Sequence, residues 1–224
     1  MSPLNLSFLK ICGITRKEDA AFACNLGVSA IGFVAFSKSN RFLSSVDVHK
    51  IISQVIKKYP KTKRVGVFVN EDFSTIIAYL KSGINVVQLH GDETVDYVCK
   101  LRKVILMEHF DAEIWQAIRL RTTKDVILSK KYSVDKYLVD SFVKGKAGGT
   151  GIRCDWDLAE FAVNALSKPV ILAGGLTSKN ICKAVRKVHP FGIDISPGVE
   201  SSPGVKDHNL LRELISICKT NWSG

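Results

Sequence analysis

Short apolar runs alternate with longer amphipathic runs along the whole chain. The short runs are rich in β-branched residues and mostly apolar on both faces, which is typical of parallel strands covered by helices. The longer runs repeat apolar residues every three or four positions and often begin with Ser or Asp, which predicts helices. The predicted strands span residues 8–12, 29–36, 64–70, 86–90, 104–110, 137–141, 169–175 and 191–196. The predicted helices follow them at 16–27, 44–59, 71–83, 92–102, 111–122, 155–166, 177–188 and 207–222.

Eight strand–helix units in 224 residues predict an α/β protein with the (β/α)₈ TIM barrel fold. A doubly wound open sheet is the alternative, although such a sheet rarely needs eight units. The fifth unit, residues 104–135, has the least distinct boundaries, because its helical run is long and lacks clear ends. No linker rich in Pro, Gly or Ser divides the chain, so we expect a single domain over residues 1–224.

Polar residues stand at the ends of most predicted strands, where a barrel of this type carries its active site. Alternation places Lys10 and Cys12 on one face of a strand whose other residues suit a core. The apolar neighbours of Lys10 argue against a solvated face, and a nearby ammonium would favour the thiolate form of Cys12. For Gln88 and His90 a hydrogen-bonded place in the core is an equal alternative. The polar residues that end the other strands are Arg41, Asn70, Gln88, His90, Asp140, Asp194 and Ser196.

Three glycine-rich turns, at 144–156, 173–177 and 196–200, can bring backbone N–H groups close to a phosphate. The loops after the seventh and eighth strands form a standard phosphate site in (β/α)₈ barrels. The last two turns therefore predict a phosphate-binding site at the mouth of the barrel.

The formal net charge of +11 favours an anionic partner. Lys and Arg are spread along the sequence without an aromatic-spaced RNA motif or a zinc finger, so a small anionic substrate is preferred to a nucleic acid. A basic, non-catalytic nucleic-acid-binding protein remains the alternative from another functional class. No stretch approaches the ~20 apolar residues of a membrane helix and no signal peptide is evident, so we expect a cytoplasmic protein without membrane contacts.

Six cysteines are scattered through the chain, at Cys12, Cys24, Cys99, Cys154, Cys182 and Cys218. None forms a C-x-x-C motif or pairs with a histidine at metal-ligand spacing, so we expect no metal site and no disulfide framework. The four cysteines in helical runs are interpreted as packing residues. Cys154, in a loop, is the one competitor of Cys12 as a reactive thiol.

Several motifs resemble the phosphoribosylanthranilate isomerase family. They are KICGIT (10–15), GFVAFSKSNRF (32–42), VQLHGDE (87–93), LVDS (138–141), GGTGIRCDW (148–156), ILAGGL (171–176) and GIDISPGVESSPGVKD (192–207), in order over nearly the whole chain. The resemblance implies a (β/α)₈ barrel enzyme of tryptophan biosynthesis. Such an enzyme converts N-(5-phosphoribosyl)anthranilate to 1-(2-carboxyphenylamino)-1-deoxyribulose 5-phosphate without a metal or an organic cofactor.

The resemblance also implies roles for individual residues. The general base falls on Cys12, the general acid on Asp140, and the contact with the anthranilate on Arg41. We expect Lys10 and His90 to contact the substrate as well. The residues expected around the phosphate of the substrate are Gly174, Gly175, Asp194, Ser196 and Gly198.

Two residues depart from the family pattern. Cys154 stands where an aromatic residue is more usual before the Asp-Trp pair. Pro197 replaces a small residue, and proline lacks a backbone N–H that could bind phosphate.

The implied reaction is an Amadori rearrangement, which needs an acid to open the sugar ring and a base to remove the C2 proton. Cys12 would have to be at least partly thiolate near neutral pH, and Asp140 would have to hold a proton until the ring opens. Another phosphosugar barrel, indole-glycerol-phosphate synthase, is the enzyme alternative, but its chemistry usually calls for lysine and glutamate at strand ends. The expected partner is the phosphosugar-anthranilate substrate, bound by a monomer or a weak homodimer.

Overall fold

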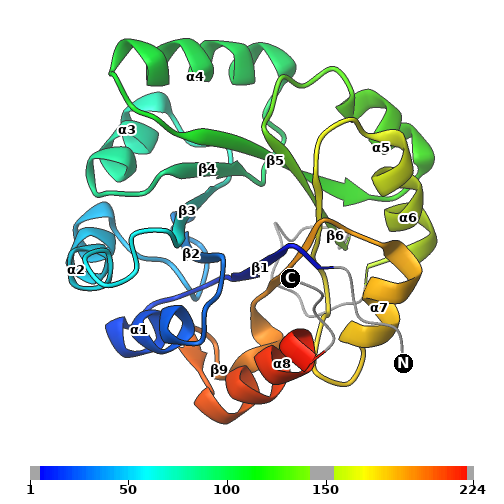
Figure 1. Ribbon diagram of the computed structural model, residues 1–224. Coiled ribbons are helices and arrows are strands. Elements are labelled where there is room, and N and C mark those ends of the chain that lie inside the picture. The colour runs from blue at the N-terminus through cyan, green and yellow to red at the C-terminus, as the bar shows by residue number, and fades with distance from the viewer. Residues whose placement is uncertain (1–5, 142–153, 221–224) are drawn as a thin grey trace.

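Eight parallel strands close into a barrel in the computed structural model, which describes residues 6–141 and 154–220. The strands follow one another around the barrel in chain order, and β8 pairs with β1 to close it. The helices form a ring outside the strands (Figure 1). The predicted (β/α)₈ barrel is therefore confirmed, and the pairing of β1 with β8 excludes the open sheet.

The barrel strands are β1 (Phe8–Ile11), β2 (Ala30–Val34), β3 (Lys63–Phe68), β4 (Val86–Leu89), β5 (Glu113–Leu120), β6 (Lys136–Ser141), β7 (Val170–Leu172) and β8 (Gly192–Ile195). The helices are α1 (Lys17–Asn25), α2 (Ser45–Val55), α3 (Phe73–Lys81), α4 (Val95–Met107), α5 (Thr123–Ser129), α6 (Trp156–Ala165), α7 (Ile181–Val188) and α8 (His208–Thr220). The chain between β8 and α8 forms η1 (Pro197–Val199), β9 (Glu200–Ser202) and β10 (Val205–Lys206). Most of the predicted glycine-rich turn at 144–156 lies outside the described residues.

Apolar side chains fill the interior of the barrel. Phe8 and Trp115 meet edge to face with ring centroids 5.6 Å apart, and Leu138 and Ile171 belong to the same buried cluster. A second, larger cluster lies between the strands and the surrounding helices. Because side chains fill the interior, the barrel has no central pore, and the active site is expected at the mouth, where the carboxyl ends of the strands meet the loops.

The boundaries predicted for the fifth unit are wrong. The run at 104–110 does not form a strand, because it continues the buried stripe of α4, in which Val98, Leu101 and Ile105 recur at helical spacing. Strand β5 instead occupies most of the predicted helix at 111–122. Its side chains alternate between the barrel interior and the helices, as the period of a strand requires.

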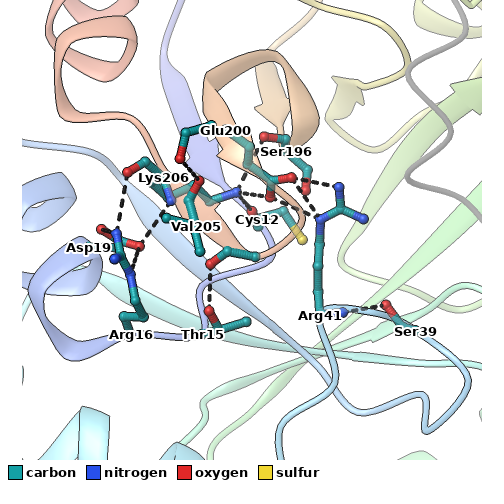
Figure 2. Close-up of polar contacts among 12 residues, drawn as sticks. Cys12, Thr15, Arg16, Asp19, Ser39, Arg41, Ser196, Glu200, Val205 and Lys206 are labelled. Carbon is teal, nitrogen blue, oxygen red and sulfur yellow. Dashed lines mark hydrogen bonds and ion pairs between the residues drawn. The ribbon is translucent and has the colours of Figure 1, made fainter.

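After β8 the chain forms a short antiparallel hairpin, β9–β10, which lies next to the end of β1. Asp19 in α1 anchors this hairpin: its carboxylate accepts a hydrogen bond from the backbone N–H of Lys206 at 3.0 Å and also binds Arg16 and His208. The hairpin thereby carries Glu200 and Lys206 to the mouth of the barrel (Figure 2). Within the described part of the chain, no helix combines the length and the apolar character needed to cross a membrane.

Candidate active site

Lys10 and Asp194 form a buried ion pair inside the barrel, next to its mouth. Strands β1 and β8 pair in register at these two residues, and Nζ of Lys10 lies 2.7 Å from Oδ2 of Asp194. Burial acts to lower the pKa of Lys10, but Asp194 and the thiolate form of Cys12 outweigh it, so this pKa lies above its ordinary value. Lys10 is therefore a buried ammonium, and the carboxylate of Asp194, expected near the phosphate, is engaged by it.

Cys12 directly follows β1 and lies beside Lys10. Its thiol packs over Gly32 of β2, where an added Cβ atom would lie 2.8 Å from Sγ of Cys12 and 3.0 Å from Cε of Lys10. Burial raises the pKa of the Cys12 thiol above its ordinary value, although the charges of Lys10 and Lys206 act in the opposite direction. The sequence predicted a shift toward the thiolate, and the structure differs because burial outweighs the nearby ammonium.

Gly13 lets Arg41 cross the end of β1. The backbone of Gly13 has a φ of 73°, in the region that favours glycine, and an added Cβ would lie 2.5 Å from Cδ of Arg41. Arg41 comes from the loop after β2 and donates from Nε to Oε1 of Glu200 at 2.9 Å and from Nη2 to Oε2 at 2.6 Å. The structure thus brings Arg41 beside Cys12, together with a carboxylate that the sequence analysis did not anticipate (Figure 2).

Asp140, His90 and Gln88 form a polar cluster on the other side of the mouth. Oδ2 of Asp140 lies 3.3 Å from Nε2 of His90, and both side chains are buried. The side-chain nitrogen of Gln88 lies 3.1 Å from Nδ1 of His90. Oδ1 of Asp140 accepts a hydrogen bond from the backbone N–H of Ser141 at 2.7 Å. The cluster therefore gives the Asp140 carboxyl group one backbone donor and places the imidazole of His90 beside its other oxygen.

The glycine turns after β7 and β8 lie against each other. A Cβ atom on Gly198 would overlap the carbonyl oxygen of Leu176, and one on Gly174 would lie 2.9 Å from Oδ1 of Asp140. Gly174 and Gly175 have φ angles of 86° and 63°, which bend the turn after β7 back over the mouth. The glycines expected to bind phosphate are thus close together and adjacent to Asp140.

The two departures from the family pattern both lie beside these turns. Pro197 occupies the start of η1, where a backbone N–H has no partner within the helix. Ser196 precedes it, and its Oγ lies 2.9 Å from where a Cβ of Gly13 would stand, so this hydroxyl faces the end of β1. The N–H of Cys154 donates to the carbonyl of Gly174 at 3.4 Å, and burial raises the pKa of the Cys154 thiol to about 12. Cys154 is therefore a buried thiol whose raised pKa disfavours the thiolate.

The helical cysteines differ in exposure. Cys24 and Cys218 are buried, Cys182 is partly buried, and Cys99 is exposed on α4. The interpretation as packing residues is therefore wrong for Cys99.

Within residues 6–141 and 154–220, no group of three or more His, Cys, Asp or Glu side chains is placed to hold a metal ion.

Three charged residues at the mouth were missed in the sequence. Nη2 of Arg119 donates to the carbonyl oxygen of His90 at 2.9 Å, and Arg119 was missed because β5 was placed too early. The alternation of Trp115 and Ala117 with outward-facing neighbours would have brought Arg119 to the mouth. Glu200 and Lys206 lie in a polar stretch whose pattern does not distinguish buried from exposed charges.

A closed parallel barrel with acid, thiol and ammonium groups at the carboxyl ends of its strands defines a (β/α)₈-barrel enzyme. The family model for N-(5'-phosphoribosyl)anthranilate (PRA) isomerase matches residues 9–216. The chain belongs to this family and is an isomerase of tryptophan biosynthesis.

Relatives and solved structures resemble the chain over nearly its whole length. The N-(5'-phosphoribosyl)anthranilate isomerase of Synechococcus elongatus is 39% identical over 218 residues, which cover 95% of this chain and 96% of the relative. The enzyme of the same name from Acetivibrio thermocellus is 38% identical, with 94% of each chain covered. The structure of phosphoribosyl anthranilate isomerase from Thermotoga maritima matches with a TM-score of 0.83 at 32% identity, covering 96% of this chain and all 100% of that one. A complex of such an isomerase with reduced 1-(o-carboxyphenylamino)-1-deoxyribulose 5-phosphate matches with a TM-score of 0.81, at the same identity and coverage.

Proposed function

We propose that the chain isomerises N-(5-phosphoribosyl)anthranilate with Cys12 as the general base and Asp140 as the general acid. The observation that carries this proposal is the placement of a buried thiol after β1 and a buried carboxyl group in β6 at one mouth. The two groups stand on strands that are not neighbours, so a sugar between them can be approached from two sides.

The substrate has two anionic ends, and the mouth offers a place for each. The turns that contain Gly174 and Gly198 suit its phosphate, because glycines allow backbone N–H groups to approach an anion. Arg41 suits the carboxylate of the anthranilate, because a guanidinium can bind a carboxylate through two parallel hydrogen bonds. The reduced compound bound to the related isomerase carries both a carboxyphenyl group and a phosphate, which supports this two-ended binding.

The chemistry needs one proton delivered and one removed. Asp140 protonates the ring oxygen of the ribose, and the ring opens to a Schiff base between C1 and the anthranilate nitrogen. The thiolate of Cys12 removes the proton on C2, and the resulting enolamine tautomerises to the ketone. The carboxylate that Asp140 becomes accepts a hydrogen bond from the backbone N–H of Ser141, and the imidazole of His90 lies beside its other oxygen.

The base must lose its own proton before it can act. Burial holds that proton on Cys12, and Lys10 and Lys206 are the charges that favour its release. We therefore propose that Lys10 acts on the reaction through the thiol, and that kcat/KM rises with pH as the thiolate forms.

A fluorescence assay tests the proposed function. The fluorescence of the anthranilate in the substrate should fall when the enzyme is added, and chromatography should show the deoxyribulose product. The Cys12→Ser/Asp140→Asn double variant is the control and should leave the fluorescence constant. Turnover by that double variant at the rate of the wild type would show that residues other than Cys12 and Asp140 carry out the proton transfers.

Some expectations from the sequence stay predictions. They are the cytoplasmic location, the single domain over residues 1–224, the absence of nucleic-acid binding and the monomer or weak homodimer. The relative from Thermotoga maritima is described as dimeric, which makes a measurement of the oligomeric state of this chain worthwhile.

A further inference from the structure

Two buried charges, Glu200 and Lys206, and the partly buried Arg41 form a continuous network between the loop after β2 and the β9–β10 hairpin (Figure 2). Glu200 is at its centre: Oε2 accepts a hydrogen bond from Nη2 of Arg41 at 2.6 Å, and Oε1 accepts one from Nζ of Lys206 at 2.7 Å. The side chain of Glu200 is 4% exposed and that of Lys206 is fully buried. Removing such charges from water is unfavourable, so a gain in stability alone does not explain the network.

Lys206 directs its ammonium group to three acceptors. They are the carboxylate of Glu200, the carbonyl oxygen of Cys12 at 2.5 Å and the carbonyl oxygen of Ser196 at 3.3 Å. Three acceptors match the three N–H groups of an ammonium. Burial lowers the pKa of Lys206, and the Glu200 carboxylate opposes that shift. Lys206 therefore ties the end of β1 and the turn after β8 to the hairpin.

Glu200 holds one edge of the Arg41 guanidinium and leaves the rest of it available. Nε and Nη2 of Arg41 both donate to this carboxylate. A guanidinium has five N–H groups, so three remain after a bidentate pair. In Figure 2 the remaining terminal nitrogen of Arg41 points away from Glu200. The positive charge of Lys206 balances that of Glu200, so an anion that approaches this edge meets an uncancelled guanidinium.

We propose that Glu200 and Lys206 are positioning residues that fix the guanidinium of Arg41 for the carboxylate of the substrate. This inference rests on the proposed function of Arg41 at the anthranilate carboxylate. Without Glu200, the long side chain of Arg41 would sample several rotamers and would lose that freedom each time a substrate binds. Without Lys206, the charge of Glu200 would cancel that of Arg41.

Glu200→Gln tests the proposal, because glutamine keeps the shape and removes the charge that holds Arg41. We expect KM for N-(5-phosphoribosyl)anthranilate to rise about tenfold with kcat changed by less than about threefold, since the lost contact serves binding. Inorganic phosphate, which lacks the carboxylate, should inhibit this variant and the wild type with inhibition constants within about twofold of each other. A merely structural role would weaken phosphate inhibition together with substrate binding. Glu213→Gln, on the exposed face of α8, is the matched control and should change nothing.

A double-mutant cycle with Arg41→Ala shows whether Glu200 acts through Arg41. In the Arg41→Ala background, Glu200→Gln should change KM by less than about twofold, because the group that it positions is gone. Full additivity of the two effects would overturn the proposal. If Arg41→Ala raises KM and Glu200→Gln does not, the positioning role fails while the proposed function stands. If Arg41→Ala itself leaves KM unchanged, the role of Arg41 fails and the positioning role fails with it.

A second variant covers the case in which Glu200→Gln does not fold. Glu200→Gln/Lys206→Met removes both partners of the buried pair and leaves neither charge uncompensated. The same rise in KM is expected of this double variant, whereas its phosphate inhibition can also weaken, because Lys206 binds the carbonyl oxygen of Ser196 in the turn after β8. An unchanged KM in the folded double variant would contradict the proposal.

Discussion

Nε2 of His90 lies 3.3 Å from Oδ2 of Asp140, although the two residues come from β4 and β6, which are not adjacent in the barrel. Strand β5 runs between them and contributes Arg119, whose Nη2 donates to the carbonyl oxygen of His90 at 2.9 Å. Arg119 also pairs in register with Asp140 across β5 and β6. Arg119 thus holds the backbone carbonyl of His90, whose imidazole lies beside the proposed acid.

Arg119→Met should lower kcat about tenfold, less than the loss that a 1 Å misplacement of a catalytic group can cause. The physical reason is that the backbone of His90 loses its donor, so the imidazole is no longer fixed against Asp140. KM should change by less than about threefold. Arg119→Lys should recover part of the rate, because an ammonium can still donate to one carbonyl. Steady-state kinetics of the three proteins decide this, and an unchanged kcat in Arg119→Met would make the arginine a structural residue.

The reactivity of Cys12 toward a thiol reagent should rise with pH and go on rising above about pH 8.5, the ordinary pKa of a thiol, because burial raises this pKa. Lys10→Met should move the profile to still higher pH, since it removes a charge that favours the thiolate. Asp194→Asn should move it to lower pH, since Asp194 acts to raise the pKa of Cys12. Rates of inactivation by iodoacetamide at several pH values give the three profiles, and bound product should protect the thiol.

Exposed Cys99 will also react with the reagent, so the labelling is done in a Cys99→Ser background. Peptide mapping should then find the label that accompanies inactivation on Cys12. Label found first on Cys154 would contradict this description of the thiol. So would a pH profile of inactivation that Lys10→Met does not shift.

Arg41→Ala should reduce kcat/KM by ~10–100-fold, the size of one or two charge-assisted hydrogen bonds to the substrate carboxylate. The fold should be preserved, because Arg41 contacts other elements through its side chain at the mouth and not through the core. Circular dichroism and steady-state kinetics provide the two readouts. Arg186→Ala, on the exposed face of α7, is the matched control. Unchanged kinetics in Arg41→Ala would show that this arginine does not bind the substrate.

Inorganic phosphate should inhibit competitively by binding at the turns after β7 and β8. Gly198→Ala should weaken that inhibition, because the added methyl group would overlap the carbonyl oxygen of Leu176 and displace one turn from the other. Inhibition constants for phosphate compare the two proteins. Noncompetitive inhibition, or a crystal soaked in sulfate with no anion near Gly175 or Gly198, would count against this site.

The order of the strands and the position of several candidate site residues at the mouth could be predicted, because each follows from a local pattern, whereas their roles stay predictions. Lys10 and Cys12 lie on one face because side chains alternate along a strand. Asp140 stands at the end of an apolar run that predicts a strand. The fifth unit could not be placed in this way, because the apolar end of α4 has the composition of a strand and only its register with Val98 and Leu101 identifies it as helix.

The charges around Arg41 were beyond prediction for a different reason. Glu200 and Lys206 stand in a polar stretch, and their burial depends on how the β9–β10 hairpin folds against β1 and α1. The pKa of Cys12 is likewise a tertiary property: the sequence shows the nearby Lys10, whereas the burial that outweighs it is visible only in the fold.

In the proposed mechanism Asp140 delivers the proton that opens the sugar ring, and the kcat of Asp140→Asn tests this role most directly. Asparagine keeps the shape of the side chain and cannot deliver the proton, so kcat should fall by ~10²–10⁴-fold, the usual worth of general acid catalysis. Affinity for the product, measured by fluorescence titration, should remain close to that of the wild type. A kcat within about threefold of the wild type would contradict the account and require another acid at the mouth of the barrel.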